Sequence, residues 1–254
     1  MTRKVPFLAE EAIERDAEAL LAGFSHARDV VIETPIPIED IVEKHLKLRI
    51  EFDDMHARHD VPRPLDGDAD ILGAIYGDGS IFIDQSLDPD ENPSKEGRYR
   101  FTVAHEGGGH WRLHQHLIRG HSGQSSLFDN DGDPKFLCRS SQKPPEEWQA
   151  DFYASCLLMP RKLVFAAWDK MFPDRKRRVI APETKVEHPF VEVPRISCSI
   201  AGHDWTESVE EALDGIARPL AEKFLVSPIA MRIRLEKLGL LMREVPHQQI
   251  LGAD

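Results

Sequence analysis

The chain has 254 residues and a mass of 28.8 kDa. Hydrophobic residues make up 41% of it and charged residues 30%, which is typical of a globular protein with enough apolar residues for a sizeable core. Its 32 Lys and Arg residues against 44 Asp and Glu residues give a formal net charge of −12, which argues against broad, charge-driven binding to nucleic acid or to an anionic membrane. No apolar run approaches the length of a membrane span and the three cysteines are isolated, so we expect a reduced, cytoplasmic protein with no membrane partner.

The first half of the chain is expected to begin with helices and to continue with short strands. Apolar residues at helical spacing predict an amphipathic helix over residues 8–22 and a second helix over residues 37–45. Residues 46–52 alternate between apolar and polar side chains, which indicates a half-buried strand. Two β-prone runs, 71–76 and 80–84, are separated by a Gly-Asp-Gly turn and predict a hairpin.

The second half is expected to be mainly helical. A helix should start near Arg98 and carry a histidine-rich stretch. Residues 120–145 show no periodicity and are expected to form a loop. Helical patterns resume over residues 145–158 and 162–170. Residues 181–204 have β-branched residues between prolines and are expected to be irregular extended chain.

Two further helices are expected near the end of the chain, over residues 207–224 and 228–238. The second has Ser227 as its N-cap, Pro228 at its first position and Gly239 as its terminator. A serine hydroxyl accepts a terminal N–H, proline lacks the N–H that would stay unpaired there, and glycine tolerates the left-handed conformation that ends a helix.

The histidine-rich stretch is the first indication of chemistry, because five of the twelve histidines fall between positions 105 and 121. His105-Glu106 followed by His110 is similar to the His-Glu-x-x-His motif of zinc peptidases. In that motif two histidines on one helical face share a metal ion, and the glutamate reaches the metal-bound water as general base.

The spacing of His105 and His110 departs from that motif, because the two residues are five apart instead of four. At about 100° per residue, side chains four apart diverge by about 40°, whereas side chains five apart diverge by about 140°. A π-bulge would absorb the additional residue and realign the two imidazoles. Gly107, Gly108 and Gly109 favour such a bulge, since they carry no Cβ and tolerate unusual backbone angles.

A shifted arrangement is the alternative metal site. Glu106, His110 and His114 are spaced four apart and share one helical face without distortion. They would supply one oxygen and two nitrogen ligands, with His105 outside the site. This arrangement leaves no evident general base, because Trp111 follows His110. A stretch without any catalytic metal is the third interpretation.

A second signature lies about forty residues further on, where Glu147 and Asp151 stack on one face of an expected helix. Catalytic zinc commonly takes two histidines and one glutamate and keeps its fourth position for water. A carboxylate one turn from the glutamate ligand can accept the other ring N–H of a zinc-bound histidine and fix its tautomer. Alone, the two acids would indicate a surface pair on an amphipathic helix.

Three segments in this order resemble the ImmA/IrrE family of metallo-endopeptidases. Residues 100–106 read Arg-Phe-Thr-Val-Ala-His-Glu, against the family's Arg-Phe-Thr-Leu-Ala-His-Glu. Residues 147–160 are similar in Glu-x-x-Ala-Asp and in the closing Leu-Leu-Met-Pro, and residues 224–241 resemble the helical segment that ends the family's domain. The expected hairpin also precedes the catalytic helix, and the resemblance covers roughly residues 36–245.

The resemblance implies a zinc ion held by His105, His110 and Glu147, with Glu106 as general base. Asp151 takes the place of the carboxylate that supports a histidine ligand. Relatives cleave helix-turn-helix transcriptional repressors, often those encoded beside them, so the resemblance also implies that class of protein substrate. The family has two residues between the histidines, whereas this chain has three.

The resemblance further implies an α+β fold, with a small zincin-like (gluzincin) domain whose short β-sheet packs on the metal-binding helix and a C-terminal segment of helix-turn-helix type. We expect an N-terminal helical extension over residues 1–35, the zincin-like domain over 36–200, the helical segment packed on it over 201–245, and a tail over 246–254. A substrate segment is expected to add as a strand to an edge at residues 80–84.

Two other classes of function fit the same patterns. One is a zincin-like module that binds a partner regulator without cutting it, which the three glycines favour. The other is a DNA-binding regulator that uses residues 227–238 as a recognition helix with Arg232, Arg234 and Lys237 exposed. Those three charges are equally typical of the solvent face of a packing helix.

Overall fold

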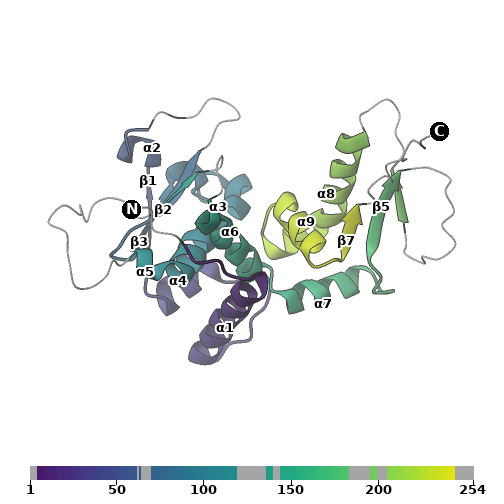
Figure 1. Cartoon of the computed structure of the whole chain (residues 1–254), viewed down its shortest axis with the longest axis horizontal. Helices are drawn as coiled ribbons and strands as arrows, with labels where there is room; N and C mark the ends of the chain where they lie inside the picture. Colours follow the sequence, from purple (N-terminus) through teal and green to yellow (C-terminus); the bar gives the residue numbers. More distant parts are fainter. Residues whose placement is uncertain are drawn as a thin grey trace, which may run out of the picture. The chain divides into compact units, whose positions relative to one another are not determined.

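The computed structural model describes residues 5–61, 63, 70–118, 136–139, 144–182, 195–198 and 205–243. The chain divides into two compact units, the first made of Met1–Leu163 with Lys223–Val226 and the second of Val164–Glu222 with Ser227–Asp254. Both units combine helices with a small sheet (Figure 1), so the α+β class is confirmed. This division is coarser than the four segments expected from the sequence, whose boundaries stay predictions.

The first unit contains a four-stranded mixed sheet with the strand order β1-β3-β2-β4. The strands are β1 (Arg49–Asp53), β2 (Ile71–Ile75), β3 (Ser80–Asp84) and β4 (Phe136–Arg139). The predicted hairpin is confirmed as β2 and β3, in which Ala74 lies opposite Phe82. β4 pairs antiparallel to β2 inside the segment expected to be a loop, and that expectation is wrong there. A four-residue strand is too short for its periodicity to be recognised.

β3 is an inner strand of this sheet, because β1 and β2 pair with its two sides. The expectation that residues 80–84 offer an edge to a substrate is therefore wrong, and β1 and β4 are the outer strands in the described part of the sheet. The hairpin pattern identifies only one neighbour of β3. The other neighbour is a parallel strand that pairs Arg49 with Ser80, and such a long-range pairing leaves no local pattern.

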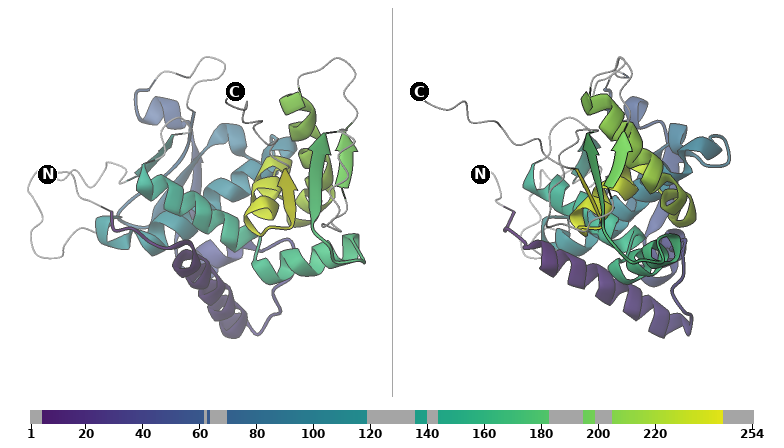
Figure 2. Two further views of the ribbon diagram at one scale, coloured as in Figure 1. Left: turned by 45° about the vertical axis from the view of Figure 1, so that its right-hand side comes forward. Right: turned by 90° about the vertical axis from the view of Figure 1, so that its right-hand side faces the viewer.

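One continuous helical path carries the histidine-rich stretch. It consists of α3 (Glu96–Val103), the π-helical η4 (Ala104–His110) and α4 (Trp111–Leu113), and right-handed backbone angles run through both junctions. α6 (Pro145–Leu158) packs against η4, and α1 (Glu10–Arg28) packs against α6 (Figure 2). The other helical segments of this unit are η1 (Asp40–His45), α2 (Met55–Arg58), η2 (Gln85–Leu87), η3 (Pro93–Lys95) and α5 (Gln115–Ile118).

The N-terminal helix α1 is a packed element of the first unit. Its apolar face is buried, as the sequence predicts, through Ile13, Ala17, Leu20, Leu21 and Phe24. At the edge of this face Asp16 accepts a hydrogen bond of 2.9 Å from the hydroxyl of Tyr153 on α6. The same carboxylate accepts two hydrogen bonds, of 3.0 and 2.9 Å, from the guanidinium of Arg112 on α4. Through this acid α1 is joined to α4, which belongs to the histidine-rich path, and to α6, which packs against η4.

The second unit has a three-stranded parallel sheet with the order β6-β5-β7. Its strands are β5 (Arg178–Pro182), β6 (Arg195–Cys198) and β7 (Leu241–Arg243), and its helices are α8 (Trp205–Phe224) and α9 (Pro228–Lys237), with α7 (Arg161–Met171) entering from the first unit. The expectation of irregular chain over residues 181–204 is wrong where β5 and β6 lie. None of the described helices is long and apolar enough to cross a membrane.

Helix α9 begins and ends as the sequence predicts. The Ser227 hydroxyl accepts the N–H of Ala230 at 3.1 Å, and Gly239 takes a φ of 68° after the last turn. The DNA-binding alternative assumed, however, that Arg232, Arg234 and Lys237 are all exposed, and this assumption is wrong. Arg234 is only 1% exposed, and Arg232 forms ion pairs with Glu210 and Asp214 on α8, so two of the three cations are turned into the unit.

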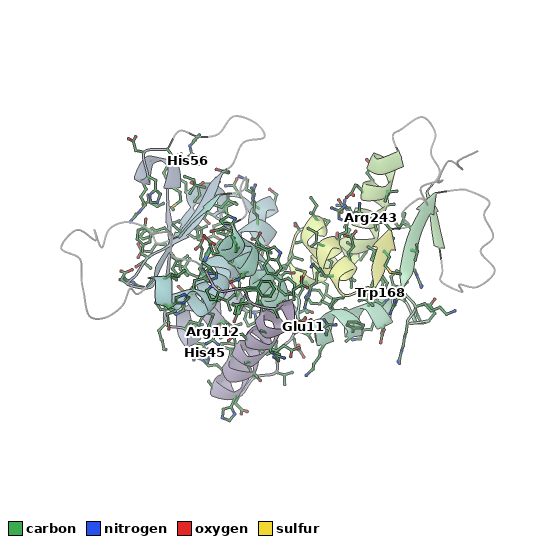
Figure 3. All side chains as sticks on the ribbon, viewed as in Figure 1. Glu11, His45, His56, Arg112, Trp168 and Arg243 are labelled. Carbon is green, nitrogen blue, oxygen red and sulfur yellow. The ribbon has the colours of Figure 1, made fainter. Side chains whose placement is uncertain are left out.

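His56 provides a test of this fold that depends on pH. The side chain of His56 is labelled in Figure 3. Its buried imidazole lies with Nε2 2.8 Å from a carboxylate oxygen of Asp70 and Nδ1 3.3 Å from the carbonyl oxygen of Val61. Burial alone would lower the pKa of His56, but the two hydrogen bonds and the charge of Asp70 raise it above the ordinary value of 6.5. The folded chain therefore holds this proton more tightly than the unfolded chain does.

A pKa that is raised on folding stabilises the fold below the unfolded pKa, and this stabilisation is lost as the pH rises through the folded pKa. We therefore expect His56→Gln to lower the free energy of unfolding by about 1–2 kcal/mol more at roughly pH 5 than at roughly pH 9. Urea unfolding of both proteins at the two pH values measures this difference. His116→Gln, at an exposed position, is the matched control, and an equal loss at both pH values would contradict the assignment.

Candidate metal centre

The π-helical segment η4 resolves the irregular spacing of the two histidines. His105 and His110 both lie within it, five residues apart, and the helix continues with right-handed angles on either side. An i→i+5 hydrogen bond spans one residue more than the i→i+4 bond of an α-helix, so side chains five apart come onto one face. The predicted π-bulge is confirmed.

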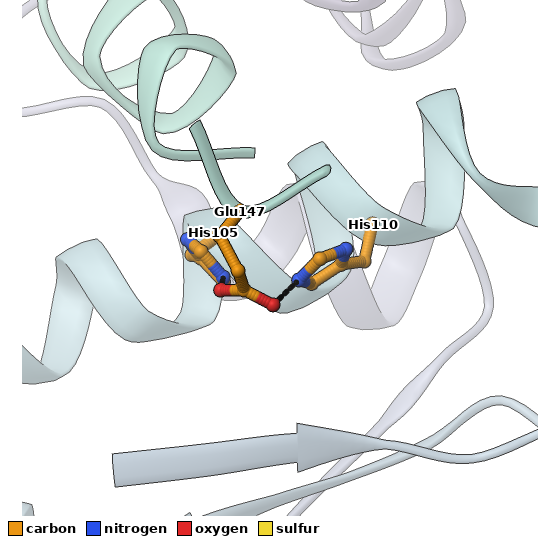
Figure 4. A group of neighbouring side chains, drawn as sticks. All are labelled: His105, His110 and Glu147. Carbon is orange, nitrogen blue, oxygen red and sulfur yellow. Dashed lines mark ion pairs between the residues drawn. The ribbon is translucent and has the colours of Figure 1, made fainter. Parts of the chain in front are cut away.

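His105, His110 and Glu147 form a buried group whose ligand atoms all lie within 4.8 Å of one another (Figure 4). Nε2 of His105 lies 3.2 Å from Oε2 of Glu147, and Nε2 of His110 lies 3.3 Å from Oε1 of the same carboxylate. The two imidazole rings are nearly perpendicular, with centroids 4.7 Å apart. Two helical segments, η4 and α6, thus direct three donor atoms toward one point.

The three glycines of η4 are explained by close packing. A Cβ on Gly107 would lie 2.8 Å from a Val42 methyl group, and one on Gly108 would lie 3.0 Å from the side chains of Tyr153 and Leu157. At Gly109 a Cβ would lie only 2.6 Å from the Cα of Ala150. None of the three glycines takes a positive φ. The expected need for unusual backbone angles is therefore replaced by a need for space, since π-helical geometry is open to any residue.

Asp151 lies where the sequence places it, beside the outer nitrogen of the first histidine. Its Oδ1 is 3.0 Å from Nδ1 of His105, on the side of the ring away from Glu147. A carboxylate can only accept, so Nδ1 donates this hydrogen bond, and a cation beside Glu147 would be bound through the lone pair of deprotonated Nε2. That lone pair is directed toward the centre of the group.

His114, the alternative ligand, lies on the outer side of His110. Its Nδ1 is 3.0 Å from Nδ1 of His110, and its Nε2 is 2.9 Å from Oε1 of Gln149 on α6. Among the described residues, the group that can hold a metal is His105, His110 and Glu147, without His114. His114 thus contacts the proposed ligand His110 through the nitrogen that faces away from Glu147.

Glu106 follows the first histidine and is completely buried. In the part of the chain that the structure describes, neither of its carboxylate oxygens has a hydrogen-bond partner. Burial raises the pKa of Glu106 to about 8, and the negative charges of Glu147 and Asp151 add to the rise while His105 opposes it. A buried carboxyl group without a hydrogen-bond partner lowers the stability of the fold. Groups with strongly shifted pKa values are concentrated at functional sites.

The charges of the three converging groups are set by their surroundings. Burial lowers the pKa of His110 to about 4, so its imidazole is neutral near pH 7. Burial would raise the pKa of Glu147, but the neighbouring His105 and His110 outweigh it and lower that pKa to about 2. An ionised carboxylate therefore faces a neutral imidazole across 3.3 Å.

These residues fit a divalent metal ion. Two imidazole nitrogens and one carboxylate oxygen are the donor set that catalytic zinc commonly takes from a protein. Nε2 of each histidine faces the Glu147 carboxylate from a buried position, and a cation between these three donor groups would be stabilised by all of them. The buried group can thus hold a metal ion.

No family model matches this chain, and a search of curated proteins gave no match. The functional interpretation therefore rests on the geometry and chemistry of the site and on the motifs in the sequence.

Gln149 is the residue of this centre that the sequence analysis missed. It is 1% exposed on α6, with Oε1 at His114 and Nε2 donating to the carbonyl oxygen of Pro6 at 2.9 Å. It stands two residues from Glu147, so it lies on another side of the helix from the Glu147 and Asp151 pair. No spacing rule singles out such a residue, because its partners come from other segments.

The contact between Gly109 and Ala150 predicts the effect of adding one methyl group. We expect Gly109→Ala to lower the free energy of unfolding by about 1–3 kcal/mol, because the new Cβ meets the α6 backbone and forces the two helices apart. Gly215→Ala is the control, at an exposed position of α8 with open space around it, and it should stabilise by about 0.5–1 kcal/mol. Urea unfolding measures both, and a Gly109→Ala chain as stable as the wild type would contradict the packing argument.

Proposed function

We propose that this chain is a zinc-dependent endopeptidase of the ImmA/IrrE type, which hydrolyses a peptide bond in a protein substrate. The convergence of His105, His110 and Glu147 through a π-bulge carries the proposal. It supplies the donor set of a catalytic zinc although the spacing of the histidines departs from the usual motif. The neighbouring Glu106, buried without a hydrogen-bond partner among the described residues, would serve as general base once a bound cation lowers its pKa.

In this proposal His105, His110 and Glu147 hold the ion, and Asp151 holds the proton on the outer nitrogen of His105. When bound, zinc polarises the scissile carbonyl group and makes a water molecule more acidic. Glu106 accepts the proton from the attacking water and returns it to the amine that leaves as the C–N bond breaks. One carboxylate serves both proton transfers because it lies next to a ligand in the same helix.

The substrate class follows from the resemblance in residues 100–106, 147–160 and 224–241. We propose a helix-turn-helix transcriptional repressor, cut in the cytoplasm as a step in the regulation of transcription. A substrate segment would bind in extended form to an outer strand of the first sheet, β1 or β4, through backbone hydrogen bonds.

The alternative of a module that binds without cutting loses its supporting observation. The three glycines suggested a damaged motif, but each of them accommodates a close neighbour, and the ligand atoms converge. Zinc binding and cleavage measured together separate the two functions, because a binding module would retain the metal and cut nothing.

Substitutions at the centre should separate metal binding from catalysis. We expect Glu106→Gln to bind about one zinc ion per chain, as the wild type does, while its peptide hydrolysis falls by about 10²–10⁴-fold, because the amide cannot accept a proton. Glu147→Gln should lose both zinc and hydrolysis. The measurements are metal content after dialysis and cleavage of a purified helix-turn-helix repressor.

Neighbouring residues provide the controls for this experiment. Glu146→Gln changes the adjacent acid on α6, which lies outside the converging group, and it should retain both zinc and cleavage. A wild-type chain that binds zinc without cutting the repressor or any unfolded protein substrate would overturn the endopeptidase assignment. Full zinc content in Glu147→Gln would overturn the ligand assignment.

A further inference from the structure

We propose that His114, Gln149 and the backbone carbonyl of Pro6 form a hydrogen-bonded relay that keeps the proton of His110 on Nδ1 and so presents its Nε2 lone pair to the metal. The three are positioning groups, since they act on the metal only through His110. The inference rests on the proposed metal centre and goes beyond it, because it assigns the residues that fix the tautomer of the second histidine ligand.

The outer end of the relay determines which group donates and which accepts in each of its hydrogen bonds. A proline has no backbone N–H, and the carbonyl oxygen of Pro6 can only accept a hydrogen bond. Nε2 of Gln149 lies 2.9 Å from that oxygen, so the amide nitrogen of Gln149 is turned toward Pro6. Its Oε1 is thereby turned toward His114, and an amide oxygen also only accepts.

In the middle of the relay, the imidazole of His114 donates with one ring nitrogen and accepts with the other. Nε2 of His114 lies 2.9 Å from Oε1 of Gln149 and must donate to it. A neutral imidazole carries one proton, so Nδ1 of His114 is left as an acceptor. This nitrogen lies 3.0 Å from Nδ1 of His110, which is therefore the donor of that hydrogen bond.

The inner end of the relay is the metal ligand itself. With its proton on Nδ1, neutral His110 keeps a lone pair on Nε2, the nitrogen that lies 3.3 Å from Glu147 and belongs to the converging group. The opposite tautomer would place two lone pairs against each other between His110 and His114. His110, His114 and Gln149 are each at most 1% exposed, so bulk water does not compete for these hydrogen bonds.

The two histidine ligands are thus supported by different devices. His105 donates to the carboxylate of Asp151, a charged and partly exposed acceptor. His110 donates to a neutral, buried chain that ends on the segment preceding α1. The N-terminal segment consequently contributes to the metal centre, although no residue of it is a ligand. This explains why a polar pair, His114 and Gln149, is buried between the helices.

The tautomers can be read directly in the full-length protein without metal. Long-range proton–nitrogen NMR of histidine-labelled protein distinguishes a protonated from a bare ring nitrogen. We expect His110 to carry its proton on Nδ1 and His114 on Nε2. The resonances are assigned in the wild-type protein through the correlations of each ring with its own backbone, and their loss in His110→Gln and His114→Gln is an additional check. His110 with its proton on Nε2 would overturn the relay, whether or not the protein has peptidase activity.

Zinc affinity, measured with Zn²⁺ alone in competition with a chelator, tests the consequence. His114→Phe and Gln149→Leu remove the acceptors and should each bind Zn²⁺ about 10–100-fold more weakly than the wild type. His114→Gln should restore affinity to within about threefold, because an amide can accept from His110 and donate to Gln149 in the same direction. His116→Gln, at an exposed position of α5, should have no effect.

These results separate the relay from the proposed function. Unchanged zinc affinity in both His114→Phe and Gln149→Leu would overturn the relay, as would a His114→Gln chain that binds zinc as weakly as His114→Phe. If the tautomers and affinities follow the expectation while no protein substrate is cut, the relay stands and the endopeptidase assignment fails. The wild-type spectrum needs no substitution, so poor folding of a variant does not leave the relay untested.

Discussion

The close approach of η4 to α6 is the constraint on which the metal centre depends. At Gly109 the two backbones come so near that an added Cβ would lie 2.6 Å from the Cα of Ala150. Ala150 stands one turn after Glu147, so this contact also decides how far the Glu147 carboxylate reaches toward the histidines. The π-helical winding of η4 then places His105 and His110 on the side that faces α6. Packing and metal geometry are therefore two consequences of the same contact.

The site gathers groups that would be unfavourable anywhere else in the fold. An ionised Glu147, the imidazole nitrogens of His105 and His110, and the buried Glu106 share one region with little access to water. Folding provides compensation from outside this region, since Asp151 on one flank and, in the proposed relay, His114 on the other accept hydrogen bonds from the two imidazoles. The fold thus keeps several hydrogen-bond acceptors close together in a buried region, and a bound cation would stabilise this arrangement.

Helix α1 shows how a segment outside the motifs supports the chemistry. Asp16 joins it to Tyr153 on α6 and to Arg112 on α4, and the preceding Pro6 contacts Gln149. Tyr153 also packs against Gly108 of the π-helical segment. The first turns of the chain therefore hold together the two helices between which the donor atoms converge.

The sequence by itself determined the local features, because their causes are local: the β2–β3 hairpin from its Gly-Asp-Gly turn, α9 from Ser227 and Gly239, and the π-bulge from the five-residue spacing of the histidines. It also pointed to His105, His110 and Glu147, through their residue types and through the resemblance of the surrounding segments to a known family. The tertiary structure decided what depends on separate segments meeting. The parallel pairing of β1 with β3, the burial of Arg234, and the contacts of Gln149 with His114 and Pro6 join parts of the chain that carry no mark of one another. Only packing in three dimensions brings such partners together, so no periodicity or motif could have shown them.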